Sequence, residues 1–183
     1  MSNLEPLLER NQAFAANGGH EGLKPLPTHM LFLVTCIDGR VDPAHVLGAD
    51  LGDALVLRNA GGRVNDEVIN EIVFIAALTE EILGDDAPPF EVAILHHTAC
   101  GSGFLADDRF RHRFAARIGV DQQDLADQAV TDPTESVRVD IARLAASSLL
   151  PDRVSLSGHV YDVETGLVTT VVPVDEMATP VTA

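Results

Sequence analysis

The feature that most constrains the fold is a set of short, continuous apolar runs that alternate with helical patterns. The first three runs cover residues 31–35 (LFLVT), 54–58 (ALVLR) and 90–95 (FEVAIL), and each contains β-branched residues. A strand buried on both faces has such a continuous pattern, whereas a strand with one solvated face alternates apolar and polar residues. The alternation of these runs with helices therefore predicts an α/β fold with a central, mostly parallel sheet flanked by helices.

Helical patterns fill the intervals between the runs, and their limits are set by caps and glycines. The long pattern that starts at Asn65 or Asp66, for example, ends at Gly84. The expected helices cover residues 4–17, 43–47, 65–83, 107–118 and 135–150. Two terminal strands are expected over residues 155–160 and 167–172, joined by a turn at residues 164–166. No internal repeat or linker interrupts the 183 residues, so a single domain is expected.

Charge and hydropathy exclude several kinds of partner. The formal net charge of −16 argues against binding to the phosphate backbone of nucleic acids and to an anionic membrane face. No apolar run reaches the 18 residues of a membrane span, and residues 1–10 lack the basic start and apolar stretch of a signal peptide. We therefore expect a cytoplasmic protein that acts on a small molecule and has no nucleic-acid or membrane partner.

The two cysteines of the chain follow two different strands. Cys36 ends the first apolar run, and His97 and Cys100 follow the third. A structural disulfide is not expected in a reducing compartment, and the carboxyl ends of parallel strands are where α/β sheets bind ligands. Two thiolates and one imidazole are donors that zinc prefers, and three protein ligands leave the open position of a catalytic site. Cys36, His97 and Cys100 are thus the predicted metal ligands.

A carboxylate and a guanidinium stand beside the first predicted ligand. Asp38 and Arg40 are two residues apart, so both side chains can point to one side of an extended chain and form an ion pair. The fourth position on the metal would be taken by water or by Asp38. We infer that Arg40 decides whether Asp38 reaches the metal or stays away from it.

These segments also allow other interpretations. His96 is interpreted as a core histidine, because neighbouring strand positions face opposite sides and His97 has the better spacing to Cys100. Residues 101–106 match the dinucleotide pattern G-x-G-x-x-A, but the sequence that follows is mostly helical and lacks the next strand of a compact βαβ unit. A non-catalytic fold, in which Asp38 permanently closes a structural Cys2His site, is a further alternative.

Three motifs together resemble a known enzyme family. They are C-x-D-x-R at residues 36–40, R-N-A-G at residues 58–61 and H-H-T-x-C-G at residues 96–101. The chain resembles the β-class carbonic anhydrases, in particular the short bacterial members, and the match is densest over residues 31–108. Many members also have a glutamine before the first cysteine and aromatic residues in the pocket. Here residues 20–35 contain no glutamine, and the chain has no tryptophan and one tyrosine.

The resemblance assigns a role to each residue of the motifs. It implies that Cys36, His97 and Cys100 hold Zn²⁺. Asp38 would be the fourth ligand in a resting state, or would accept a hydrogen bond from hydroxide on the zinc in the active state. Arg40 would hold Asp38 off the metal, and Gly101 would contact the substrate. The implied reaction is the reversible hydration of carbon dioxide to bicarbonate and a proton.

The resemblance also implies an alternative substrate and an assembly. Carbonyl sulfide and carbon disulfide hydrolases share the zinc ligands, so either activity is an alternative to carbon dioxide hydration. Family members are dimers or larger homo-oligomers whose N-terminal helix packs on a partner subunit. Residues 1–183 would then form one domain, with a helical arm over residues 1–19 and the zinc-site core over residues 30–110.

Overall fold

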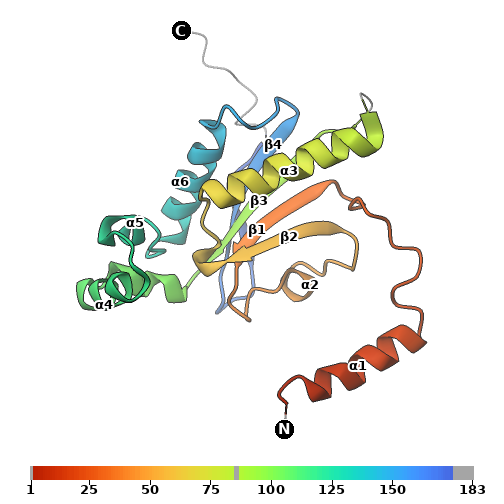
Figure 1. Ribbon diagram of the computed structural model, residues 1–183, viewed down its shortest axis with the longest axis horizontal. Coiled ribbons are helices and arrows are strands. Elements are labelled where there is room, and N and C mark those ends of the chain that lie inside the picture. The colour runs from red at the N-terminus through yellow and green to blue at the C-terminus, as the bar shows by residue number, and fades with distance from the viewer. Residues whose placement is uncertain (1, 85–86, 175–183) are drawn as a thin grey trace.

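The computed structural model describes residues 2–84 and 87–174, and its centre is one five-stranded sheet of order β2-β1-β3-β4-β5 (Figure 1). The strands are β1 (Leu31–Cys36), β2 (Ala54–Asn59), β3 (Phe90–His97), β4 (Val154–Tyr161) and β5 (Val168–Val172). The first four run parallel and β5 runs antiparallel to β4. The expected α/β architecture, with a terminal hairpin, is confirmed.

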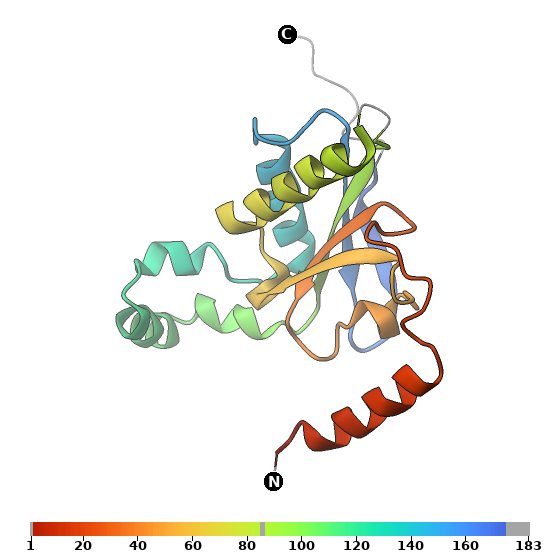
Figure 2. The same cartoon turned by 45° about the vertical axis from the view of Figure 1, so that its right-hand side comes forward.

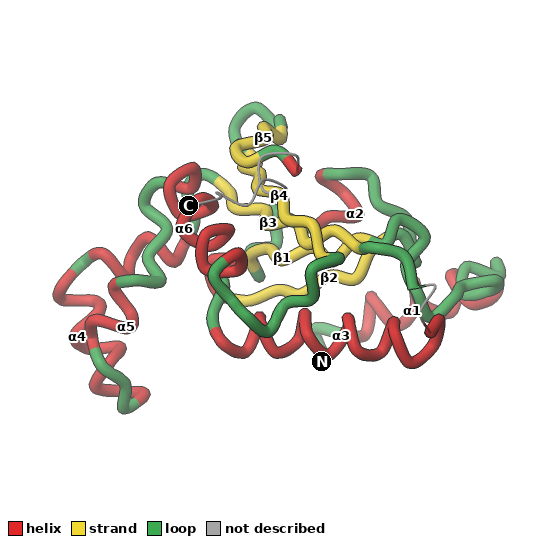
Figure 3. The backbone as a smooth tube through the Cα atoms, turned by 90° about the horizontal axis from the view of Figure 1, so that it is seen from above, coloured by secondary structure: helices red, strands yellow, loops and turns green. Residues whose placement is uncertain are grey.

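Helices cover both faces of this sheet and extend beyond one edge. The α-helices are α1 (Glu5–Ala16), α2 (Pro43–Val46), α3 (Asp66–Leu83), α4 (Asp108–Ile118), α5 (Gln122–Ala126) and α6 (Pro133–Ala145). Helices α3 and α6 lie on one face and α2 lies on the other, as the view from above shows (Figure 3). Helices α4 and α5 project from the edge at which the parallel strands end (Figure 1).

The buried core explains the continuous apolar runs. Alternate residues of β1, such as Phe32 and Val34, pack with α3 and α6 in the larger core cluster. Leu33 faces the other way and packs with Val41 and Leu95 in a second cluster. Both faces of the central strands are thus removed from water, which is why neither face needs polar residues.

Helix α6 differs from its prediction at both ends. It starts at Pro133, because the Asp132 side chain accepts hydrogen bonds from the first backbone N–H groups. It ends at Ala145 rather than at residue 150. Beyond it the Ser147 hydroxyl accepts a hydrogen bond from the Leu149 N–H, and such local bonding competes with a helix. Helix α5 and the 3₁₀ helices η1 (Ala60–Gly62) and η3 (Gly101–Ala106) were not predicted.

Helix α1 projects away from the rest of the chain (Figure 2). None of its residues is buried, and its large apolar side chains are about half exposed: Leu7, Leu8 and Phe14, with Leu4 at the N-cap. The helix itself is confirmed, whereas its packing on a partner stays a prediction. Among residues 2–84 and 87–174, no helix combines the length and the apolar character that a membrane crossing needs.

Candidate metal centre

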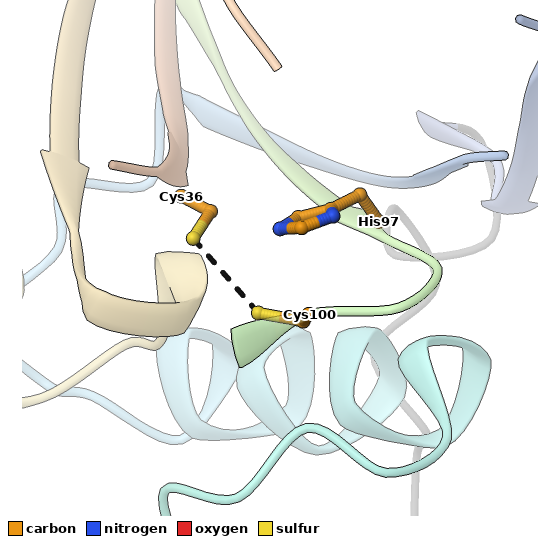
Figure 4. Close-up of side chains that lie close together, drawn as sticks. All are labelled: Cys36, His97 and Cys100. Carbon is orange, nitrogen blue, oxygen red and sulfur yellow. Dashed lines mark hydrogen bonds between the residues drawn. The ribbon is translucent and has the colours of Figure 1, made fainter. Parts of the chain in front are cut away.

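The sheet register brings the two cysteine-bearing segments together. Strands β1 and β3 are parallel neighbours, with Thr35 beside Leu95, so Cys36 and His97 both lie at the carboxyl edge. The chain then turns back through Ala99, whose φ of 52° lies in the left-handed region. This turn places Cys100 opposite Cys36, and Figure 4 shows the three side chains converging from the two segments.

The three donor atoms are close enough to share one ion. All lie within 4.8 Å of one another, and the two sulfur atoms are 3.9 Å apart. His97 is 1% exposed, and its Nδ1 donates to the Thr98 carbonyl oxygen at 2.9 Å. Because that bond fixes the proton on Nδ1, Nε2 is left as a buried acceptor, with no hydrogen-bond partner among the described residues. A metal ion fits this unpaired nitrogen.

The two thiols hold one proton between them. Donation to the Cys100 sulfur and burial raise the pKa of Cys36 to about 11. The pKa of Cys100 falls to about 6, because its sulfur accepts hydrogen bonds from Cys36 and from the Ser102 hydroxyl. One thiolate is therefore present at neutral pH, and a divalent cation has only one further proton to displace.

Asp38 and Arg40 form the expected ion pair. Arg40 donates to the Asp38 carboxylate from Nε at 3.0 Å, from NH2 at 2.6 Å and from its backbone N–H at 2.9 Å. These bonds hold the pKa of Asp38 well below its usual range. The Arg40 guanidinium also donates to the Ala99 carbonyl oxygen at 3.0 Å. Arg40 thus binds the Asp38 carboxylate and connects the two loops that carry the predicted ligands. Asp38 lies outside the group of three donor atoms.

Arg58 holds the loop that carries Cys36 and Asp38. Its guanidinium donates to the carbonyl oxygens of Cys36 and Asp38 at 2.9 and 2.7 Å, and to the Asp42 carboxylate at 2.9 Å. The R-N-A-G motif marks this residue in the sequence, but its contacts do not follow from the motif.

An open cavity of about 310 Å³ lies beside Cys36 and Asp38. Gly101 and Ser102 line part of it, and a Cβ built on Gly101 would meet no atom within 4 Å. Most of the remaining wall is apolar: Ile37, Ala60, Leu105, Phe110 and Phe114. The two phenylalanine rings stack with centroids 6.0 Å apart. Neither phenylalanine is among the predicted site residues, although their i, i+4 spacing in the predicted helix places both on one face.

The structure decides two of the alternative interpretations. His96 is fully buried and its Nε2 lies 3.1 Å from the Gly62 carbonyl oxygen, so it belongs to the core as expected. The dinucleotide-like glycines lie in η3, and three helices separate them from the next parallel strand, β4. They do not open a compact βαβ unit, so the structure gives no support for nucleotide binding there.

Comparison with known proteins identifies the family. The sequence model described as "Carbonic anhydrase" matches residues 31–111. Beta-carbonic anhydrase 1 of Mycobacterium tuberculosis is 32% identical, over 94% of this chain and 100% of the relative. A carbon disulfide hydrolase of an Acidianus species is 28% identical, over 78% of each chain.

Solved structures agree with the sequence relatives. The crystal structure of carbonic anhydrase from Streptococcus mutans superposes with a TM-score of 0.75 and 40% identity, over 93% of this chain and 98% of that chain. Carbonic anhydrase from Glaciozyma antarctica gives a TM-score of 0.66 at 29% identity, over 89% and 94% of the two chains. With this sequence likeness, this sheet and this arrangement of two thiols and an imidazole, the chain belongs to the β-carbonic anhydrase family.

Proposed function

We propose that this chain binds zinc through Cys36, His97 and Cys100 and catalyses the reversible hydration of carbon dioxide. The observation that carries the proposal is the convergence of two sulfur atoms and one unpaired, buried imidazole nitrogen within 4.8 Å. The relatives that are 30% identical or more, over nearly the whole chain, are named carbonic anhydrases, which supports the choice of reaction. A zinc ion held there supplies Lewis-acid activation of water at neutral pH.

Asp38 and Arg40 prepare the site for that chemistry. Both oxygens of the Asp38 carboxylate receive hydrogen bonds from Arg40, so Asp38 stays ionised and can only accept a further hydrogen bond. We assign Asp38 the role of orienting the attacking water by accepting its proton in a hydrogen bond. Arg40 keeps the carboxylate from becoming the fourth ligand, because the guanidinium is itself tied to the Ala99 carbonyl oxygen.

The cavity beside the site fits a small apolar substrate. Ile37, Leu105 and Phe110 present hydrocarbon surface to a linear molecule without a net charge. We propose that Gly101, which has no side chain, leaves room for the substrate there. Carbonyl sulfide and carbon disulfide fit the same wall, and relatives named carbon disulfide hydrolases favour them as the second candidate.

A metal analysis combined with stopped-flow assays tests the function. We expect about one zinc per chain and faster hydration of carbon dioxide than hydrolysis of carbonyl sulfide or carbon disulfide by the same preparation. Cys36→Ser, which keeps the shape but removes the thiolate, should lose zinc and activity together. Arg109→Ala, which changes a side chain outside the proposed site, is the control. A wild-type protein that holds stoichiometric zinc but hydrates none of these substrates refutes the catalytic proposal.

We also propose that the chain assembles into homodimers or larger oligomers in the cytoplasm. Support for assembly comes from α1, whose apolar side chains Leu7, Leu8 and Phe14 have no cover within the described chain. The two free thiols fit a reducing compartment. Light scattering of the full chain and of a variant lacking residues 1–19 tests the assembly. A monomeric full chain at micromolar concentration contradicts it.

A further inference from the structure

Asp140 is a buried carboxylate on α6 for which the reaction has no direct use. It is 1% exposed, and it accepts hydrogen bonds from Arg63 Nε at 2.8 Å, from Arg63 NH2 at 3.0 Å and from the Val64 N–H at 3.2 Å. Burial raises the pKa of Asp140, but hydrogen bonds from His96 and Arg63 outweigh burial, so the pKa lies below its ordinary value. The carboxylate is therefore charged inside the fold, where an unpaired charge would be costly.

Arg63 extends this contact to a second segment. Its NH1 donates to the carbonyl oxygens of Asp127 and Ala129, at 2.8 and 3.3 Å, in the loop that leads from α5 to α6. Its own carbonyl oxygen accepts a hydrogen bond from Asn59 Nδ2 at 2.8 Å. Arg63 directly follows η1, so these bonds fix the point at which the chain leaves that turn.

His96 ties the same carboxylate to Gly62, the last residue of η1. Its Nε2 lies 3.1 Å from the Gly62 carbonyl oxygen and 3.3 Å from Asp140 Oδ2. A single buried N–H therefore points at both groups. Asp140 thus holds the end of η1 twice, through His96 at Gly62 and through Arg63, the residue that follows.

The turn that is held in this way touches the predicted metal ligands. A Cβ added at Gly62 would lie 2.9 Å from the Thr35 carbonyl carbon and 3.0 Å from the Cys36 nitrogen, so the turn packs directly on the end of β1. A Cβ added at Gly61 would lie 2.9 Å from the hydroxyl oxygen of Ser102, which contacts Cys100. A small displacement of η1 would therefore move both sulfur atoms.

We propose that Asp140 is a positioning residue of the metal centre, which sets the place of the two thiolates by holding η1 through Arg63 and His96. The inference rests on the proposed zinc site. Asp140 accepts hydrogen bonds from Arg63 and Val64, which precede it by 77 and 76 residues in the sequence. Helix α6 thus acts on the site across the fold.

The test compares Asp140→Asn with Val137→Ala, a change in the same helix. Val137 is fully buried in the main core cluster and makes none of the hydrogen bonds above, so its truncation lowers stability without releasing η1. In a chelator competition we expect Asp140→Asn to weaken zinc binding about 10- to 100-fold, the usual effect of losing an outer partner of a metal site. Val137→Ala should stay within about twofold of wild type at a comparable loss of Tm.

Cobalt substitution supplies a second readout. The thiolate-to-cobalt charge-transfer band should shift in Asp140→Asn and remain unchanged in Val137→Ala, because only the first variant moves the sulfur atoms. If Asp140→Asn does not fold, Arg63→Lys decides, since it keeps the charge opposite Asp140 but loses the two-pronged contact. Wild-type affinity and an unchanged band in the folded variant overturn the inference. A wild-type chain that binds no zinc refutes the proposed function instead.

Discussion

Replacing Gly62 by alanine tests how closely η1 must approach β1. Gly62 has a φ of +68°, a conformation that costs an alanine about 1–2 kcal/mol. The new methyl group would also lie 2.9 Å from the Thr35 carbonyl carbon and 3.0 Å from the Cys36 nitrogen. Both contacts are to backbone, which cannot rotate away, so relief requires a shift of the turn or the strand.

The size of the effect follows from these two terms. Forcing a methyl group into a packed interior adds about 1–3 kcal/mol to the cost of the backbone conformation. The sum is about 2–5 kcal/mol, and for a chain of this length each kcal/mol lowers Tm by about 2–4 °C. We therefore expect Gly62→Ala to lower Tm by roughly 10 °C and to weaken zinc binding, because the turn moves away from Cys36.

Gly48→Ala is the matched control. Gly48 has a φ of +66°, and a Cβ there would meet no atom within 4 Å. This variant should suffer only the conformational cost, a fall in Tm of about 4 °C, and should keep its zinc affinity. Calorimetry and chelator competition on both variants decide the matter. Equal losses of Tm in the two variants would refute the close approach as the cause.

Three further predictions follow from the site. In zinc-free protein the thiolate ultraviolet absorbance should rise in two separate steps, near pH 6 and near pH 11, because Cys36 and Cys100 share a proton; one step for both near their ordinary value contradicts this. Arg40→Ala should raise the pKa of Asp38 toward its ordinary value, which a carbon-13 NMR titration measures. In wild type, the lowered pKa of Asp38 contributes to stability above about pH 4, and this contribution is lost as the pH falls through the pKa of the folded state. The variant should therefore lose less stability in acid than wild type. Ala99→Gly should raise Tm by roughly 2–4 °C, because glycine adopts the φ of 52° at that turn without steric strain. Ala142→Gly on the exposed side of α6 is the control and should lower Tm. A lower Tm in both variants would show that Ala99 is not strained.

The strands and the three converging donors could be predicted because their signals are local. A strand buried on both faces needs a continuous apolar run, and its carboxyl end is marked by the polar residue that interrupts the run. Cys36 and the pair His96-His97 stand at such ends. Parallel pairing then brings the ends to one edge without any further information. The cap at Asn65 and the stop at Gly84 are equally local, and both limits of α3 are confirmed.

The residues that support the site could not be found in this way. Asp140 is the only acidic residue in the middle of α6. An acidic residue in a helix is usually exposed, so the sequence alone predicts a solvated side chain here. Its burial depends on Arg63, 77 residues away, and no spacing rule connects the two. The start of α6 is a different case, since Asp132-Pro133 is a recognisable cap and first-turn pair that could have been used.

Helix α1 has a consequence for the dynamics of the chain. A helix of 12 residues is marginal in water unless other parts of the protein cover it, and none of its residues is buried within this subunit. Its backbone amides should exchange with deuterated solvent far faster than those of α3 when the protein is dilute. If a second copy of the chain covers Leu7 and Leu8, the same amides should become protected as the concentration rises, so exchange at this one helix reports the association of subunits.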